Sequence, residues 1–213
     1  MTRARELPED LDRILHDLRG PLNAIAMHLE VVKRAIPHDL PAKQSVDTVQ
    51  QEVERLAVML PAAFQVVALE ADELRPLDVR AVVAFVVEER HLAAVTLAPG
   101  PWPHARADAR LLAIAVEHLL RNALEATPKD APRPPHVSAH ATADGVVLSV
   151  RNWGATLPSS SPKVLIRLGS RRKPGHQGVG LVTVERIARL LGGALRFETP
   201  DDGAEVRLVL RPA

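Results

Sequence analysis

Two apolar repeats near the N-terminus most constrain what this 213-residue chain can fold into. Both repeats alternate spacings of four and three residues, which is typical of the a and d positions along a coiled-coil helix. The first repeat consists of Leu11, Leu15, Leu18, Leu22, Ile25, Leu29, Val32 and Ile36. The second consists of Val46, Val49, Val53, Leu56, Leu60, Ala63 and Val67. The sequence therefore predicts two long helices, over 6–36 and 44–72.

Prolines predict how these helices are joined. Pro37 and Pro41 end the first helix, because proline lacks the backbone N–H that a helix needs, and they leave only a short connection before the second. Pro21 and Pro61 fall inside the helices, where we expect bends. Two helices with a short connection form an antiparallel hairpin. A hairpin covers only part of each apolar seam, so the simplest complete structure is a four-helix bundle made by a homodimer.

After Pro76 the pattern changes to alternating helices and strands. The predicted helices cover 78–89, 109–126 and 179–191, and the predicted strands cover 91–98, 137–141, 146–150, 194–198 and 204–210. We therefore expect an α+β chain with two domains. A helical hairpin occupies 1–74, and an α/β sandwich occupies 75–213, in which helices cover one face of a mixed sheet.

The composition excludes several classes of function. The chain has 27 Lys and Arg against 26 Asp and Glu, with no basic stripe, so it does not predict nucleic-acid binding. It has no Cys, which excludes disulfides and Cys-based zinc sites. No apolar run is long enough for membrane insertion, and the first residues lack the apolar centre of a signal peptide. We expect a soluble, cytoplasmic protein.

His16 and Asp17 are the first candidate for chemistry. His16 falls at a b position, next to the predicted seam rather than in it, so it should be exposed on a rigid helix. An imidazole nitrogen can attack phosphorus if a neighbouring group takes or orients the other ring proton, and the carboxylate of Asp17 can do that. A solvated His–Asp pair on a helix surface remains the simpler alternative.

The second candidate lies on the predicted helix 109–126. His118, Asn122 and Glu125 share one face of it, at positions i, i+4 and i+7. A carboxamide oxygen is a suitable hard ligand for Mg²⁺, which bridges nucleotide phosphates. The alternative is the polar face of an ordinary amphipathic helix.

Two glycine-containing turns complete the candidates. Asn152-Trp153-Gly154-Ala155-Thr156 follows a predicted strand, and Gly178-Val179-Gly180-Leu181 opens a predicted helix. Glycines at a helix N-terminus expose backbone N–H groups to phosphate oxygens, and the helix dipole assists. Taken singly, each stretch is also compatible with a plain turn.

In order along the chain, the runs 16–25, 117–127, 152–156 and 175–181 resemble the H-box, N-box, first glycine box and second glycine box of two-component sensor histidine kinases. The resemblance implies that His16 accepts a phosphoryl group and that Asp17 is its acid/base helper. It implies an ATP site in which Asn122 holds Mg²⁺ and His118 orients the phosphates. The same resemblance assigns nucleotide contacts to Asn152, Gly154, Gly178, Gly180 and Leu181.

The chain departs from this family's pattern at several positions. Asn152 stands where an Asp accepts a hydrogen bond from adenine, and Thr156 replaces a glycine. Gly20 replaces a Thr or Asn that supports phosphatase action. The aromatic residues of the lid between the glycine boxes are also replaced, by Val164, Leu165 and Leu168, with Arg171, Arg172 and Lys173 nearby.

The implied activity is that of an ATP-dependent protein-histidine kinase. Such an enzyme phosphorylates itself on His16 and then passes the phosphoryl group to an aspartate of a response-regulator receiver domain. The degraded first glycine box keeps a second possibility open. The chain would then be a non-catalytic histidine phosphotransfer protein, or a pseudokinase with a degenerate ATP site.

Overall fold

The computed structural model describes residues 9–36, 40–128, 130–131, 133–154, 156–157, 165–166 and 179–213, with the side chains at 9–14, 17 and 21 outside the description. The chain forms two compact units. The first contains two helices and runs to Ala68, and the second contains a sheet with its helices and begins at Leu69. The domain boundary expected between residues 74 and 75 stays a prediction. None of the described helices has both the length and the apolar character needed to cross a membrane.

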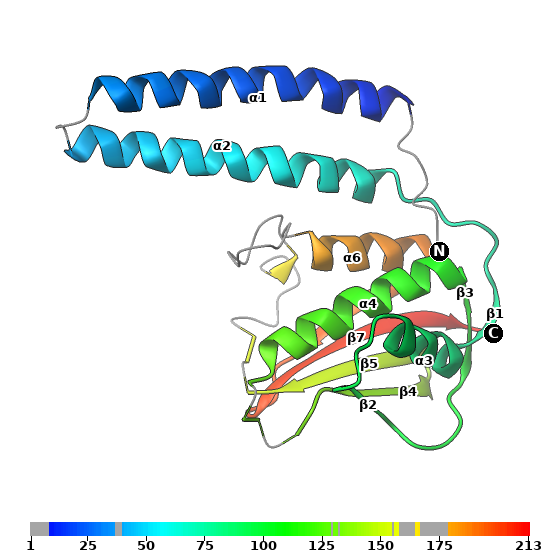
Figure 1. Ribbon diagram of the computed structural model, residues 1–213. Coiled ribbons are helices and arrows are strands. Elements are labelled where there is room, and N and C mark those ends of the chain that lie inside the picture. The colour runs from blue at the N-terminus through cyan, green and yellow to red at the C-terminus, as the bar shows by residue number, and fades with distance from the viewer. Residues whose placement is uncertain are drawn as a thin grey trace. The chain divides into compact units, whose positions relative to one another are not determined.

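The first unit is the predicted antiparallel helical hairpin (Figure 1). It consists of α1 (Glu9–Ala35) and α2 (Leu40–Val67). An ion pair joins the two helices, with 2.7 Å between Nζ of Lys33 and a carboxylate oxygen of Asp47. This contact raises the pKa of Lys33, chiefly through the hydrogen bond to Asp47. Pro61 lies inside α2, which continues past it.

The predicted bounds of the second helix were wrong at both ends. α2 begins at Leu40 rather than at residue 44, and it ends at Val67 rather than at residue 72. The apolar repeat itself ends at Val67, which is the last helical residue. Beyond it, the backbone groups of 69–74 bond to side chains of the second unit, so they do not continue the helix.

The apolar seam of the hairpin is only partly covered. Leu15 is 4% exposed and Val53 is 8% exposed. By contrast, large seam side chains spaced seven residues apart on each helix are between 36% and 47% exposed; these are Leu18, Ile25 and Val32 on α1, and Val49 and Leu56 on α2. One side of the hairpin therefore presents an apolar stripe, which we call the seam stripe.

The second unit is a sheet covered on one face by helices (Figure 1), as predicted. Its elements are β1 (Arg75–Asp78), α3 (Val79–Glu89), β2 (Thr96–Leu97), β3 (His104–Ala107), α4 (Ala109–Ala126), β4 (His136–Thr142), β5 (Gly145–Trp153), α6 (Gly180–Leu190), β6 (Ala194–Glu198) and β7 (Gly203–Pro212). The strand order is β1-β3-β7-β5-β4-β2, with β6 also paired to β7. β2 pairs with β4 in parallel and the other pairs are antiparallel, so the sheet is mixed.

Three short strands differ from the sequence expectation. β1 and β3 were not predicted, and they pair with each other along their full length. A strand was predicted over 91–98, but β2 contains only Thr96 and Leu97. His91 adopts a φ of 52°, a left-handed conformation that interrupts an extended segment directly after α3.

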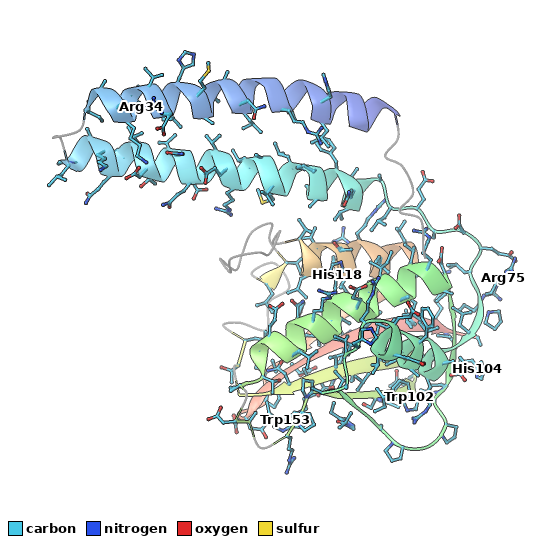
Figure 2. The ribbon with its side chains drawn as sticks, viewed as in Figure 1. Arg34, Arg75, Trp102, His104, His118 and Trp153 are labelled. Carbon is cyan, nitrogen blue, oxygen red and sulfur yellow. The ribbon has the colours of Figure 1, made fainter. Side chains whose placement is uncertain are left out.

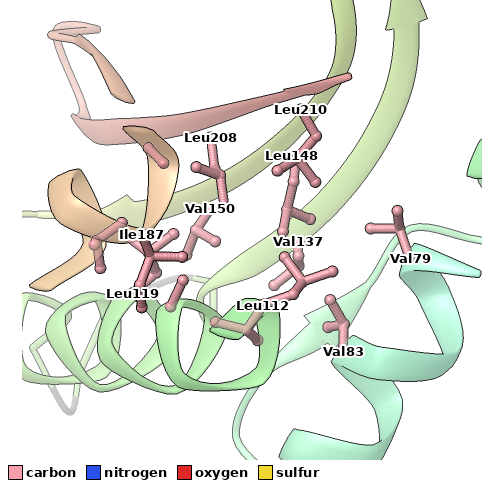
Figure 3. Close-up of a cluster of buried hydrophobic side chains, with 14 of the residues drawn as sticks. Val79, Val83, Leu112, Leu119, Val137, Leu148, Val150, Ile187, Leu208 and Leu210 are labelled. Carbon is pink, nitrogen blue, oxygen red and sulfur yellow. The ribbon is translucent and has the colours of Figure 1, made fainter. Parts of the chain in front are cut away.

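The core lies between the helices and the sheet (Figure 3). The fully buried side chains include Val79 and Val83 from α3, Leu112 and Leu119 from α4, Ile187 from α6, and Val137, Leu148, Val150, Leu208 and Leu210 from the sheet. Close packing of these aliphatic side chains fixes α4 and α6 against the sheet, and truncating a buried Leu to Ala would cost about 2–5 kcal/mol. These two helices carry most of the candidate site.

Candidate nucleotide-binding site

Helix α4 is held rigidly and carries two of the predicted site residues. Asp108 caps its N-terminus, because its Oδ1 accepts a hydrogen bond from the backbone N–H of Leu111 at 3.0 Å. The apolar face of α4 is fully buried against the core, including Leu112 and Leu119. His118 and Asn122 lie one turn apart and remain partly accessible.

Gly180, the first residue of α6, lies beside both of these side chains. A Cβ atom on Gly180 would lie 3.5 Å from Nδ1 of His118 and 3.9 Å from Nδ2 of Asn122. Figure 2 shows His118 on α4 beside α6. The backbone N–H groups in the first turn of α6 point away from the helix toward its N-terminal end, where the helix dipole favours an anion. The fold therefore brings an imidazole, a carboxamide and a helix N-terminus together.

The imidazole of His118 is kept neutral by its surroundings. Burial lowers the pKa of His118, and the neighbouring Glu117 opposes that shift while Arg121 adds to it. Glu117 is itself paired with Arg121 at 3.0 Å and with Arg90 at 2.9 Å. A neutral imidazole has one donor and one acceptor nitrogen, so His118 can hydrogen-bond to a phosphate without adding a charge.

Asn122 can supply one oxygen ligand to Mg²⁺. Among the described residues, no three His, Asp or Glu side chains come together as a metal site. A single carboxamide oxygen would suit a Mg²⁺ ion that is bound together with a nucleotide, because such an ion needs few protein ligands. The carboxamide oxygen of Asn122 is such a ligand.

Asn152 and Gly154 lie at the end of β5. Asn152 is 5% exposed and continues the inward alternation of Val146, Leu148 and Val150. Gly154 has a φ of 110°, and a Cβ there would come within 2.6 Å of Cδ of Pro128, which follows α4. Both facts require glycine at this turn, independently of any ligand.

Of the remaining predicted residues, some lie in the described part of the chain and others do not. Leu181 is half-buried and packs against the core from the first turn of α6. Leu165 is 5% exposed. Gly178 lies outside the described residues, as do Val164, Leu168 and the basic residues at 171–173.

His16 lies on α1 as predicted, exposed and directly after the buried Leu15. Its position matches a b site next to the seam. The side chain of Asp17 lies outside the description, so its role as a helper stays a prediction.

Comparison with known proteins assigns the second unit to a family. The model of the histidine kinase-, DNA gyrase B- and HSP90-like ATPases matches residues 107–213, about half of the chain. This range contains α4, β5 and α6, the elements that carry His118, Asn122, Asn152 and Gly180.

Three curated relatives match most of the chain. The nitrogen regulation protein NtrY of Azorhizobium caulinodans is 24% identical over 93% of this chain and 28% of its own length. The sensor protein BasS of Salmonella typhimurium is 25% identical over 94% of this chain and 58% of its own length. The sensor protein CreC of Escherichia coli is 26% identical over 89% of this chain and 42% of its own length. The chain thus spans between about a quarter and three-fifths of these relatives.

Solved structures show the same fold. A mycobacterial sensor histidine kinase, MprB, matches 66% of this chain and 99% of its own chain with a TM-score of 0.53 and 25% identity. Full-length ShkA, solved in complex with AMPPNP, matches 98% of this chain and 47% of its own with a TM-score of 0.57 and 21% identity. The chain belongs to the histidine kinase-, DNA gyrase B- and HSP90-like ATPases and contains an ATP-binding catalytic core of the histidine-kinase type.

Proposed function

We propose that this chain is the core of a histidine protein kinase in a two-component system. It uses ATP to phosphorylate His16 and then transfers the phosphoryl group to an aspartate of a response regulator. The observation that carries the proposal is the meeting of His118, Asn122 and Gly180 in a fold of the ATPase family. The helical hairpin that precedes this fold presents His16 on its surface. We place this core in the cytoplasm, where ATP is available.

In the nucleotide site, each group has a distinct task. The backbone N–H groups of α6 and the neutral imidazole of His118 hold phosphate oxygens, and Asn122 would hold Mg²⁺, which would neutralise phosphate charge. We assign the second glycine box, with Gly178, Gly180 and Leu181, to the phosphates. Asn152 accepts a hydrogen bond from the adenine amino group, and Gly154 forms the turn beside it.

The reaction at His16 is an in-line displacement. A ring nitrogen forms a bond to the γ-phosphorus while the bond from that phosphorus to the bridging oxygen of ADP breaks. Asp17 takes or orients the proton on the other ring nitrogen. The phosphoramidate then passes its phosphoryl group to the carboxylate of the regulator. Arg19 and Asn23, both exposed on α1, are candidate contacts for that partner.

We propose a homodimer through the hairpin. The seam stripe is spaced for a second helical layer, because its side chains recur every seven residues on both helices. A second copy of the hairpin would cover it and complete a four-helix bundle.

Labelling with γ-³²P-ATP and Mg²⁺ tests the kinase proposal. The wild-type protein should acquire acid-labile label, and His16→Gln should acquire none. Asn122→Asp should lose at least nine-tenths of the labelling rate while its circular dichroism stays unchanged, because the added negative charge repels the phosphates. Equal labelling of wild type and His16→Gln would show that His16 is not the acceptor.

The alternative function rests on one observation. Asn152 and Thr156 depart from the adenine-binding pattern that the resemblance implies. A phosphotransfer protein without kinase activity predicts no label from ATP, but label on His16 after incubation with a phosphorylated regulator. A pseudokinase predicts that His16→Gln leaves signalling in the cell intact.

A further inference from the structure

Residues 69–74, which we call the linker, are the first residues of the second unit, and side chains hold them to the rest of that unit. The backbone carbonyls of the linker accept hydrogen bonds from three arginines. Nη2 of Arg186 donates to Leu69 at 3.3 Å, and Nη2 of Arg110 donates to Glu70 at 2.8 Å. Nη2 of Arg106 donates to Leu74 at 3.2 Å. Because three of its six carbonyls bond to arginines of the second unit, the linker is structurally part of that unit.

A buried carboxylate completes this attachment. Asp108 is 5% exposed, and its two oxygens have different partners. Oδ1 caps α4 through the N–H of Leu111, and Oδ2 accepts the backbone N–H of Asp72 at 2.9 Å. The guanidinium of Arg110 lies 3.8 Å from Oδ2. Loss of the linker would leave a buried carboxylate oxygen without its donor, which is unfavourable. We call Arg106, Asp108, Arg110 and Arg186 the linker clamp.

The linker clamp and the nucleotide site share two helices. Arg110 lies in the first turn of α4, and His118 lies eight residues further, about 12 Å along the same helix. Gly180 begins α6, and Arg186 lies about 9 Å along it. α4 and α6 pack against each other, so this helix pair holds the linker with one set of side chains and the candidate nucleotide site with another.

We propose that the linker clamp contains positioning residues for phosphoryl transfer to His16 and couples nucleotide binding to the linker. This inference rests on the proposed function. When the linker is clamped, fewer free residues connect the nucleotide-binding unit to the hairpin. A shorter free connection raises the effective concentration of bound ATP at His16. Coupling is reciprocal, so bound nucleotide slows release of the linker, and release of the linker weakens nucleotide binding by the same factor.

The test is the double variant Arg110→Ala/Arg186→Ala in the full chain. Hydrogen exchange of the Asp72 amide, followed with and without AMPPNP and Mg²⁺, reports on the clamp. We expect exchange at least ten-fold faster than in wild type, and slowing by nucleotide in wild type only. Labelling of His16 at saturating ATP should show a kcat at least five-fold lower than in wild type. The dissociation constant for AMPPNP should rise by the same factor by which AMPPNP slows exchange at Asp72 in wild type. A purely structural defect would not make these two factors equal.

Two further variants make the test specific. Arg189→Ala removes an arginine from the same helix α6 that pairs with Glu185 one turn earlier, and it should behave as wild type. Arg110→Lys/Arg186→Lys retains the charge and a donor at each position, and it should restore at least half of the lost kcat. If the double alanine variant fails to fold, the single variants Arg110→Ala and Arg186→Ala take its place.

The outcomes separate the two proposals. Unchanged exchange at Asp72 in the double variant would overturn the clamp, and faster exchange with unchanged kcat would overturn its positioning role. If the wild-type protein binds nucleotide but labels no histidine, the kinase proposal and the positioning role both fail, whereas exchange at Asp72 still decides whether the clamp and its coupling exist.

Discussion

At the scale of single residues, Gly180 sets the space available at the start of α6. Its missing side chain leaves room beside His118 and Asn122, where phosphate oxygens are proposed to bind. Gly193, by contrast, lies against the backbone of β7, since a Cβ there would come within 1.9 Å of the carbonyl oxygen of Val209. A side chain at Gly193 would therefore clash with the backbone, whereas a side chain at Gly180 would occupy the space proposed for phosphate.

Gly180→Ala should separate binding from stability. Its Cβ would sit at ordinary contact distance from its neighbours, and alanine favours a helix over glycine by about 0.5–1 kcal/mol, so the free energy of unfolding should not fall. Nucleotide affinity should drop at least five-fold because the methyl group occupies the phosphate space. Calorimetric titration with AMPPNP and urea unfolding check this pair of outcomes. Gly193→Ala is the matched control and should lose stability instead; equal nucleotide affinity for Gly180→Ala and wild type would contradict the site.

The lowered pKa of His118 predicts a dependence of stability on pH. Since the folded state binds a proton less readily than the unfolded state, whose pKa is about 6.5, unfolding takes up protons in the window below that value. The free energy of unfolding should therefore fall as the pH drops below about 6.5. Urea unfolding at several pH values should show a smaller decrease for His118→Asn than for wild type. Parallel curves for the two proteins would show that His118 is not the group responsible.

Local sequence patterns single out some of these residues and not others. His118, Asn122 and Gly180 belong to local motifs, and each motif predicts its own chemistry from residues close together in the chain. Asp108 was recognisable only as a helix cap, because capping involves the next three residues. Its bond to Asp72 joins residues 36 apart, and no local pattern predicts such a contact.

At the scale of elements, two aspartate caps differ in their surroundings. Asp78 caps α3 by accepting the N–H of Ala81 at 3.1 Å, and it is exposed. Asp108 caps α4, is buried and also holds the linker. A cap that makes one exposed hydrogen bond should matter less than one that makes a buried capping bond and a second bond to the linker.

Replacing each cap with alanine tests this difference. Asp78→Ala should cost about 1 kcal/mol of stability, which is typical for a lost N-cap. Asp108→Ala should cost about 3 kcal/mol, because the capped N–H of Leu111 is buried and the bond to Asp72 is lost as well. Urea unfolding of both variants gives the comparison. A loss at Asp108 no larger than at Asp78 would show that the second bond contributes nothing.

Helices were predictable here where periodicity and caps agreed. α4 occupies 109–126 as expected, since Asp108 and a continuous amphipathic pattern fix its start and length. β1 and β3 were missed because each has only four residues and lies toward an edge of the sheet. β1 also contains Pro76, and β3 has alanines as its only inward residues, so neither resembles a strand in isolation.

At the scale of the whole molecule, the seam stripe predicts an assembly. Ile25, 45% exposed, lies on this stripe, whereas Met27, 62% exposed, lies about 200° further around the same helix. Ile25→Glu would bury an unpaired charge in a dimer, and it should raise the dissociation constant at least 100-fold. Met27→Glu is the control and should leave the dimer intact. Sedimentation velocity across a range of protein concentrations distinguishes the two, and a wild-type protein that stays monomeric would contradict the bundle.

The attachment of 69–74 also decides where this chain can be cut. A recombinant fragment that starts at Arg75 would lack the acceptors of Arg106, Arg110 and Arg186 and the donor to Asp108. A fragment that starts at Leu69 would keep every one of these bonds. Chimeras that join this ATPase unit to a foreign helical hairpin should therefore be joined directly before Leu69. The ATPase unit then keeps residues 69–74 and all of their hydrogen bonds.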